Sequence, residues 1–259
     1  METFQGESLR IENLGFRYAG DRENVLSGLN LDLKIGETLC IAGASGMGKS
    51  LLLRIIAGLE APTYGDVYYF GEHLPRSLHV PLEVARRGVE LIFQNGALIS
   101  NLTVRENVSM PLYYHHRGHR DEIEKRASMA LDLMRVRAEE SKYPHMLSSG
   151  VAKRVAIARS WAMDPRLLLM DEPTAGLDNY NRNVLIPLID NMKAMFNTSL
   201  ILVTHDLLIA KELGADLCFL SEKKLTPRLK FEEWFNSDLP VAHEMFRNLR
   251  EFQDNRPLS

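Results

Sequence analysis

The sequence predicts an α/β fold in which helices cover a parallel β-sheet. Apolar runs typical of buried strands occupy residues 38–42, 89–93, 167–170, 199–203 and 216–220. The last three runs alternate with segments of helical periodicity, and this alternation is typical of a parallel sheet packed against helices. The first run ends in a glycine-rich turn, after which a helix is indicated by the spacing of Leu52, Leu53, Ile55, Ile56 and Leu59.

The opening third of the chain contains two further predicted strands. Leu29, Leu31, Leu33 and Ile35 alternate with polar residues, which is the period of a half-buried strand. Residues 67–70 form another apolar run of strand length. The first third therefore contributes mainly β-structure to the predicted fold.

The middle of the chain has helical patterns instead. Thr103 and Glu106 have the spacing of a capping box, and the helix that they open is predicted to end near Pro111. A third helix is predicted over residues 151–161, before the stop signal Asp164-Pro165. Between them, one face of an amphipathic helix is marked by Ile123, Ala127, Ala130, Leu131 and Met134.

These patterns predict a single domain over residues 1–225. Its α/β core comprises residues 1–94 and 163–225, and a helical subdomain at residues 95–162 interrupts it. Residues 226–259 are expected to form a helical tail, in which apolar residues recur at near-helical spacing: Phe231, Trp234, Phe235, Ala242, Phe246 and Leu249. Packing of this face on its own domain is the favoured interpretation, and contact with a second subunit or an accessory protein is the alternative.

Composition excludes several classes of protein. The 259 residues are 45% hydrophobic and 25% charged, which is typical of a folded globular chain, and the formal net charge of −3 argues against nucleic-acid binding. No stretch approaches the roughly 18 apolar residues of a membrane-spanning helix, and the first ten residues lack the pattern of a secretory signal. Cys40 and Cys218 lie in strand-like runs and form no disulfide framework, so we expect a reducing compartment.

A phosphate-binding loop is the strongest motif. Residues 43–50 match the P-loop pattern and lie between a predicted strand and a predicted helix, as phosphate binding by backbone N–H groups requires. Lys49 is expected to contact the β- and γ-phosphates, and the Ser50 hydroxyl to ligate Mg²⁺. The residues predicted to contact the nucleotide here are Gly43, Ala44, Ser45, Gly46, Met47, Gly48, Lys49, Ser50 and Leu51.

Two carboxylates follow the predicted strand at residues 167–170. A strand beside the P-loop strand would place Asp171 near the Mg²⁺, through water. Glu172 is then positioned to polarise an attacking water molecule. A pair of this kind is a weak signal alone, and it becomes strong beside a P-loop.

One segment separates this chain from other P-loop proteins. Leu147, Ser148, Ser149, Gly150 and Val151 resemble the signature Leu-Ser-Gly-Gly-Gln of ATP-binding cassette (ABC) ATPases. Four further segments resemble that family's motifs in the same order along the chain. They are the adenine-stacking aromatic Tyr18, the Q-loop glutamine Gln94, the D-loop at residues 175–178, and the switch histidine His205.

The resemblance implies an ABC fold, with a parallel-sheet core, an N-terminal antiparallel β region and the inserted helical subdomain. It implies a homodimer that closes head to tail on two ATP molecules, with Ser148 and Gly150 of one copy meeting the γ-phosphate held by the other copy. Glu172, His205 and Lys49 would be the catalytic residues. Mg²⁺ would be held by Ser50, Gln94 and, through water, Asp171.

The signature departs from the family pattern at two positions. Ser149 replaces a glycine, which puts the backbone conformation there in question, because a Cβ restricts φ and ψ. Val151 replaces the glutamine and lacks its polar contacts. We therefore expect the anion contact of Ser148 and Gly150 to be retained, with turnover or coupling altered.

The same resemblance implies a role in transport. The family's nucleotide-binding subunits work at the cytoplasmic face of the inner membrane, as peripheral proteins docked on separate permease subunits. Residues 95–112, the apolar residue after Gly150 and residues 235–246 resemble Mla-type lipid-transport ATPases, which serve MCE-protein systems; MCE, solute-binding or accessory subunits would be further partners.

Other functions stay open at this point. The chain is also compatible with an ABC ATPase for another substrate, or with a non-transport ABC ATPase that acts as a membrane-tethered mechanical signaller. A small-molecule phosphotransferase would share only the P-loop, and the cassettes of DNA repair or of ribosomes would carry insertions that are not visible here. His115, His116 and His119 form a histidine group in which a solvated loop is favoured over a metal site, since carboxylate and cysteine partners are lacking.

Overall fold

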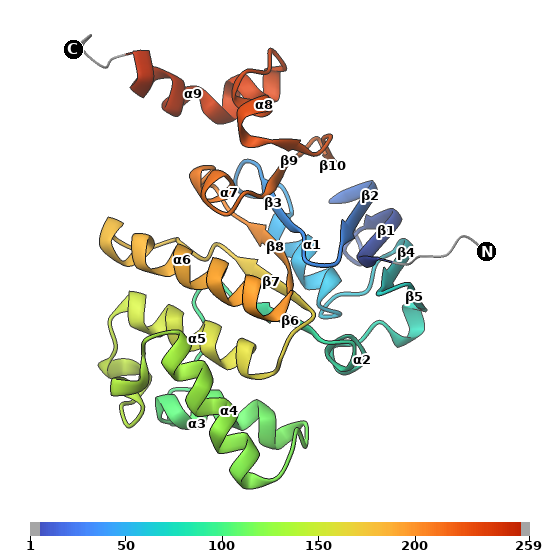
Figure 1. The fold of residues 1–259 in the computed structure, drawn as a ribbon. Helices are drawn as coiled ribbons and strands as arrows, with labels where there is room; N and C mark the ends of the chain where they lie inside the picture. The colour runs from blue at the N-terminus through green and yellow to red at the C-terminus, as the bar shows by residue number, and fades with distance from the viewer. Residues whose placement is uncertain (1–5, 255–259) are drawn as a thin grey trace.

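A computed structural model describes residues 6–254 and contains the predicted parallel sheet (Figure 1). The strand order is β10-β9-β3-β8-β7-β6, with β11 also paired to β9. The five central strands run parallel, whereas β10 and β11 are antiparallel to β9. Their bounds are β3 Thr38–Ala42, β6 Val89–Ile92, β7 Leu167–Asp171, β8 Ser199–Val203, β9 Asp216–Ser221, β10 Lys224–Leu225 and β11 Leu229–Lys230.

Each central strand is buried on both faces, because alternate residues enter two different apolar cores. In β3, Leu39 and Ile41 pack into one core, whereas Cys40 and Ala42 pack into the other. Neighbouring strands alternate in the same way, as the period-two geometry of a strand requires. Cys40 and Cys218 lie in opposite cores, and burial raises the pKa of the Cys218 thiol to about 12.

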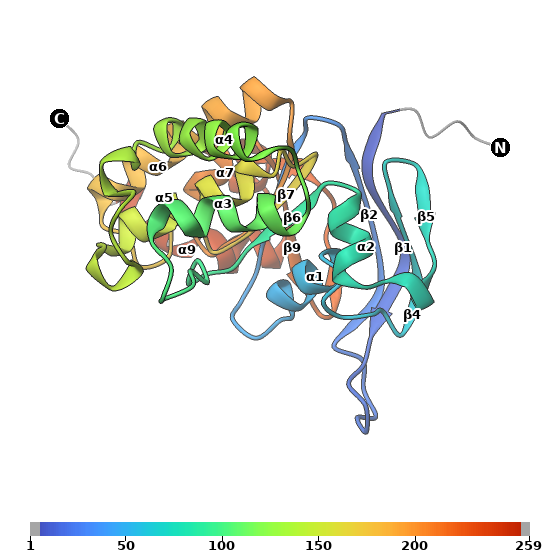
Figure 2. The same ribbon diagram turned by 90° about the horizontal axis from the view of Figure 1, so that it is seen from below.

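An antiparallel sheet covers one of these cores together with two helices. Its strand order is β2-β1-β4-β5, and Figure 2 shows it beside α1 and α2. The bounds are β1 Glu7–Phe16, β2 Leu26–Lys34, β4 Tyr64–Tyr69, β5 Glu72–Leu74, α1 Lys49–Ile56 and α2 Pro81–Arg86. The apolar side chains of this sheet and α1 fill the core that contains Leu39 and Ile41.

Helices cover the opposite core. The helical subdomain consists of α3 Val104–Tyr114, α4 Arg120–Leu133 and α5 Ser149–Ala162, which pack on one another, and α6 Asn179–Phe196 and α7 Leu208–Glu212 complete the layer. Short 3₁₀ turns lie at Arg76–Leu78, Arg137–Glu139 and Pro144–Met146. Among the described helices none is long and apolar enough to cross a membrane.

The predicted end of α3 near Pro111 was wrong. The capping box forms, since Thr103 Oγ1 accepts from the Glu106 N–H while Glu106 accepts from the Thr103 N–H. The helix, however, continues to Tyr114 with Pro111 inside it. Proline removes one helical hydrogen bond, but Val108 and Leu112 are fully buried on either side, and their packing offsets that loss.

The predicted helical tail differs from the structure at its beginning. Residues Leu229–Lys230 form strand β11 on β9, and helices α8 Phe231–Phe235 and α9 Pro240–Asp254 follow. Trp234 and Phe246 are fully buried, and the Trp234 indole donates to the Leu217 carbonyl at 2.7 Å. These helices therefore pack on their own domain, as the favoured interpretation expected.

Truncating Trp234 to Ala should lower the free energy of unfolding by about 3–5 kcal/mol. The indole lies edge-on to Phe219, with ring centroids 4.8 Å apart, so its loss leaves a cavity and an unpaired Leu217 carbonyl. Urea unfolding measures the change. Tyr180→Ala, at a side chain that is 76% exposed, is the control and should change stability by less than about 0.5 kcal/mol.

Candidate nucleotide site

The predicted site residues follow the carboxyl ends of four neighbouring parallel strands. The P-loop follows β3, His205 follows β8, the carboxylate pair ends β7, and Gln94 follows β6. Asp171 is level with Val203, and Val203 with Ile41. We had expected β7 to lie beside β3, and this was wrong because β8 lies between them.

The P-loop backbone uses conformations that favour glycine. Gly43, Gly46 and Gly48 have φ of 147°, 82° and 95°. A Cβ on Gly43 would lie 2.5 Å from the Leu220 carbonyl oxygen, so a side chain there would displace the loop from β9. Gly48 is the N-cap of α1, which directs the first N–H groups of that helix toward the loop.

Lys49 is folded back against its own loop. Its Nζ donates to the carbonyl oxygens of Gly43 at 2.8 Å and Ala44 at 2.9 Å. Burial lowers the pKa of Lys49, and the nearby charges of Glu172 and Asp171 oppose that shift. An anion entering the loop would supply the counter-charge that this buried ammonium lacks.

The P-loop and β7 meet through two oxygen atoms. Ser50 Oγ donates to Asp171 Oδ1 at 3.0 Å. Burial raises the pKa of Asp171, while the hydrogen bond from Ser50 and the charges of Lys49 and Lys153 act in the opposite direction. A hydroxyl and a carboxylate are hard oxygen donors of the kind that Mg²⁺ prefers, so the two residues fit this ion. Gln94 is exposed in the turn that follows β6.

Glu172 and His205 are in direct contact. Glu172 Oε2 lies 2.8 Å from His205 Nδ1. The backbone of Glu172 has a φ of 49°, which is uncommon outside glycine, and its N–H donates to the Val203 carbonyl at 2.8 Å. The structure thus brings into contact two of the three side chains that the resemblance implies to be catalytic.

Lys153 also contacts this end of β7, and the sequence analysis did not single it out. Its Nζ donates to the carbonyl oxygens of Glu172 at 2.8 Å and Pro173 at 3.0 Å. The only signal available in the sequence is a basic residue one helical turn after Gly150.

The signature segment begins α5. Ser148 is the N-cap, and its hydroxyl accepts from the Val151 N–H. A Cβ on Gly150 would lie 2.3 Å from Asn181 Oδ1, so glycine is required there by close packing. Ser149 is helical and needs no glycine conformation, which answers the question that its Cβ raised. Val151 packs against the apolar core.

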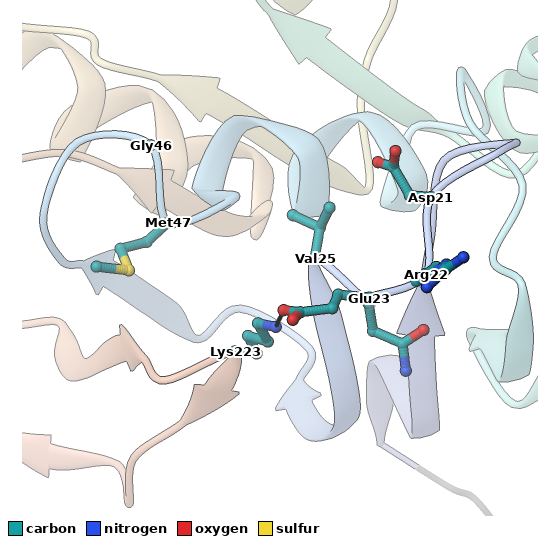
Figure 3. A pocket seen from close by; sticks show the side chains of 8 residues that line it. Asp21, Arg22, Glu23, Val25, Gly46, Met47 and Lys223 are labelled. Carbon is teal, nitrogen blue, oxygen red and sulfur yellow. Dashed lines mark hydrogen bonds and ion pairs between the residues drawn. The ribbon is translucent and has the colours of Figure 1, made fainter.

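A cavity of about 480 Å³ borders the P-loop (Figure 3). Its walls are formed by the loop before β2, by the P-loop and by the β9–β10 turn, through Asp21, Arg22, Glu23, Asn24, Val25, Gly46, Met47 and Lys223. Lys223 Nζ pairs with Glu23 Oε2 at 2.8 Å, and this ion pair is visible at the cavity edge in Figure 3.

Tyr18 precedes, along the chain, the segment from Asp21 to Val25 that lines this cavity. Its carbonyl accepts from the Asp21 N–H, and its ring is half exposed, edge-on to Phe16. The ring is therefore partly accessible, and its stacking on adenine stays a prediction.

Helix α5 also holds the turn after Gln94. Arg159 donates to the carbonyl oxygens of Gly96 and Ala97, each at 2.8 Å.

Glu90, on the edge strand β6, lies near Arg159 and Arg117, and burial raises the pKa of Glu90 to about 7 despite both guanidinium groups.

Glu90 should therefore make stability depend on pH. Because its pKa is raised above the unfolded value, the wild type should lose on the order of 2 kcal/mol relative to Glu90→Gln as pH rises from about 4.5 to about 7. Urea unfolding of both proteins at pH 5 and pH 8 measures this. Glu244→Gln, at an exposed residue, is the control, and equal pH dependence of wild type and Glu90→Gln would contradict the prediction.

A P-loop, a strand-end carboxylate pair, a histidine from the next strand and a capped signature helix together define an ATP-binding cassette. The chain belongs to the ABC transporter family, whose sequence profile matches residues 26–175. It is similar to the methionine import ATP-binding protein MetN of Mannheimia succiniciproducens, with 32% identity over 96% of this chain and 72% of the relative. It is also similar to the lipoprotein-releasing system ATP-binding protein LolD 1 of Chlorobium chlorochromatii, with 37% identity over 71% and 76%.

A solved structure agrees with the fold and the activity. The ATP-binding cassette MJ0796, in a dimeric post-hydrolysis state bound to ADP and Pi, superposes with a TM-score of 0.75. The two are 31% identical, and the match covers 86% of this chain and 98% of that one. The chain thus has the ABC ATPase fold and is an ATPase.

Proposed function

We propose that this chain is the ATP-hydrolysing subunit of a membrane transporter and acts as a head-to-tail homodimer. The observation that supports the transport role is a groove of about 650 Å³ between α2 and the end of α3. Leu82, Arg86, Tyr114, His115, His116 and Arg117 line it. Of its apolar side chains, Tyr114 is 71% exposed and Leu82 is 44% exposed.

An exposed tyrosine and leucine among arginines and histidines form a mixed surface that suits a contact with another protein. A short amphipathic helix from the cytoplasmic side of a permease subunit fits it, since the groove offers aromatic and aliphatic contacts with arginines at its edge. Glu90 connects this groove to α5, because it lies near both Arg117 of the groove and Arg159 of α5. Movement of the docked helix would therefore reach the signature segment.

Hydrolysis follows from the geometry of the site. In the ATP complex, Lys49 leaves the Gly43 and Ala44 carbonyls for the β- and γ-phosphates. Glu172 accepts a hydrogen bond from the attacking water and holds it in line, while His205 steadies the γ-phosphate. Ser50, Gln94 and, through water, Asp171 would hold Mg²⁺, which would supply charge neutralisation to the phosphates when bound. Ser148 and Gly150 of the partner subunit would complete the site.

The proposed cargo is a lipid, in an Mla/MCE-type system. Residues 95–112 support this through their resemblance to lipid-transport ATPases. Among the relatives, LolD 1 is named for lipoprotein release and MetN for methionine import, so the family spans several cargos. An ABC ATPase for another substrate, and a membrane-tethered signaller, are the alternative functions.

Within residues 6–254, no three His, Cys, Asp or Glu side chains are grouped to hold a metal, and that includes the His115 region.

Purification of the tagged chain from membranes tests this function. We expect permease subunits to copurify, with phospholipid bound to the complex, and Tyr114→Asp to abolish copurification while leaving the chain folded. Met195→Asp, at a side chain that is 58% exposed on α6, is the matched control. Recovery of a complex that binds amino acids or polyamines would contradict the lipid assignment, and recovery free of membrane subunits would contradict transport.

A further inference from the structure

Lys153 joins the signature helix to the end of the carboxylate strand. It lies one turn into α5, and its ammonium reaches β7, where it donates to two successive carbonyl oxygens, those of Glu172 and Pro173. An interaction between a lysine and two main-chain carbonyls fixes backbone orientation, because both carbonyls must face the same donor.

The backbone at Glu172 needs such support. Its φ of 49° is a left-handed conformation that costs a residue with a Cβ roughly 1–2 kcal/mol. Strained conformations persist only when the surroundings hold them. Here the N–H of Glu172 is held by the Val203 carbonyl, and its C=O is held by Lys153.

The charge at this position is also costly to maintain. Burial lowers the pKa of Lys153 to about 8, and the charges of Glu172 and Asp171 oppose that shift. A neutral residue would avoid the burial cost. A partly buried cation bonded to two carbonyl oxygens indicates that the backbone contact has a use.

We propose that Lys153 is a positioning residue, which holds the Glu172 backbone so that the carboxylate is aimed at the water-binding position and moves with the signature helix. This rests on the proposed role of Glu172 as the residue that orients water. In this proposal Lys153 acts through the backbone of Glu172 and not by a contact of its own with ATP or the attacking water. Its effect on hydrolysis is transmitted through the peptide between Glu172 and Pro173.

The test compares Lys153→Met, Lys153→Arg and Lys125→Met in the full chain. Lys153→Met should lower kcat about 10- to 100-fold, the range expected when a catalytic group is misplaced by about 1 Å, with the Kd for a non-hydrolysable ATP analogue within about twofold of wild type. Lys153→Arg, which can still donate to both carbonyls, should recover kcat to within about fivefold. Lys125, exposed on α4, should give wild-type values when replaced.

Glu172→Gln is measured alongside, so that the two assignments fail separately. Wild-type kcat in Lys153→Met with an inactive Glu172→Gln would overturn the inference alone. Near wild-type hydrolysis in Glu172→Gln would overturn the role of Glu172, and with it the basis of the inference. Parallel losses of kcat, analogue binding and Tm in Lys153→Met, without recovery in Lys153→Arg, would show that the residue serves only stability.

Discussion

Replacing Glu172 with Gln should slow ATP hydrolysis by about 100-fold or more and leave ATP binding intact. The carboxylate contacts His205 at 2.8 Å and follows Asp171, which contacts Ser50. An amide keeps the size of the side chain and one acceptor oxygen, but it is a far weaker base. The charge that orients water is therefore lost without disturbing the P-loop contacts to phosphate.

Single-turnover hydrolysis and analogue binding measure the two properties separately. Because hydrolysis separates the two halves in the proposed dimer, the variant should also form a longer-lived dimer with ATP, observable by size-exclusion chromatography. Glu60→Gln is the control. Glu60 follows α1 and pairs with Arg54, and this variant should hydrolyse ATP normally. Hydrolysis near the wild-type rate in Glu172→Gln would remove the residue from this role.

The sequence predicted the turn between a strand and a helix at residues 43–50 correctly, because the positions of the glycines determine the backbone conformation there. Gly43, Gly46 and Gly48 have the backbone angles that favour glycine, and the flanking strand and helix have strong periodicity. Ser50 and Asp171 were both predicted to lie at the Mg²⁺ position, and their contact agrees with this proximity, although the strand order that we assumed for it was wrong. Several orders of parallel strands place the same carboxyl ends at one edge, so the contact survives the error.

Other features depended on tertiary packing and left no local signal. Pro111 is a helix breaker by propensity, yet the buried Leu112 keeps it inside α3. Strand β11 is only two residues long, and it forms because the beginning of β9, which β10 does not reach, is available for pairing. The contact of Lys153 with Glu172 joins residues from an inserted helix and a core strand, which no spacing rule connects.

Helix α5 emerges as the element that connects the proposed functions. Its first residues form the signature, Lys153 holds the backbone of the carboxylate strand, and Arg159 holds the turn after Gln94. A helix is stiff along its axis. A shift of α5 at one of these contacts would therefore move the helix at the other two. In the proposed mechanism, nucleotide closure and water positioning therefore depend on the same helix.

Replacing Lys49 with Met should weaken ATP binding about 10- to 100-fold and reduce hydrolysis by roughly 1,000-fold. The loss in binding corresponds to one charge-assisted contact to phosphate, and the larger loss in rate reflects charge that develops on the phosphoryl group in the transition state. Titration with a fluorescent ATP analogue and steady-state hydrolysis measure the two values. Lys34→Met, at an exposed residue of β2, is the control.

This loss should occur without unfolding, which separates it from a structural defect. Burial lowers the pKa of Lys49, so the ammonium is disfavoured in the folded state, and replacing it by an apolar side chain of similar length removes that cost. Of the two carbonyls that it leaves, Ala44 is in the exposed part of the loop, whereas Gly43 is buried and loses its donor. These effects oppose each other, so the nucleotide-free variant should have a Tm close to that of the wild type. A lower Tm together with normal ATP binding would show that Lys49 supports the loop rather than the phosphate.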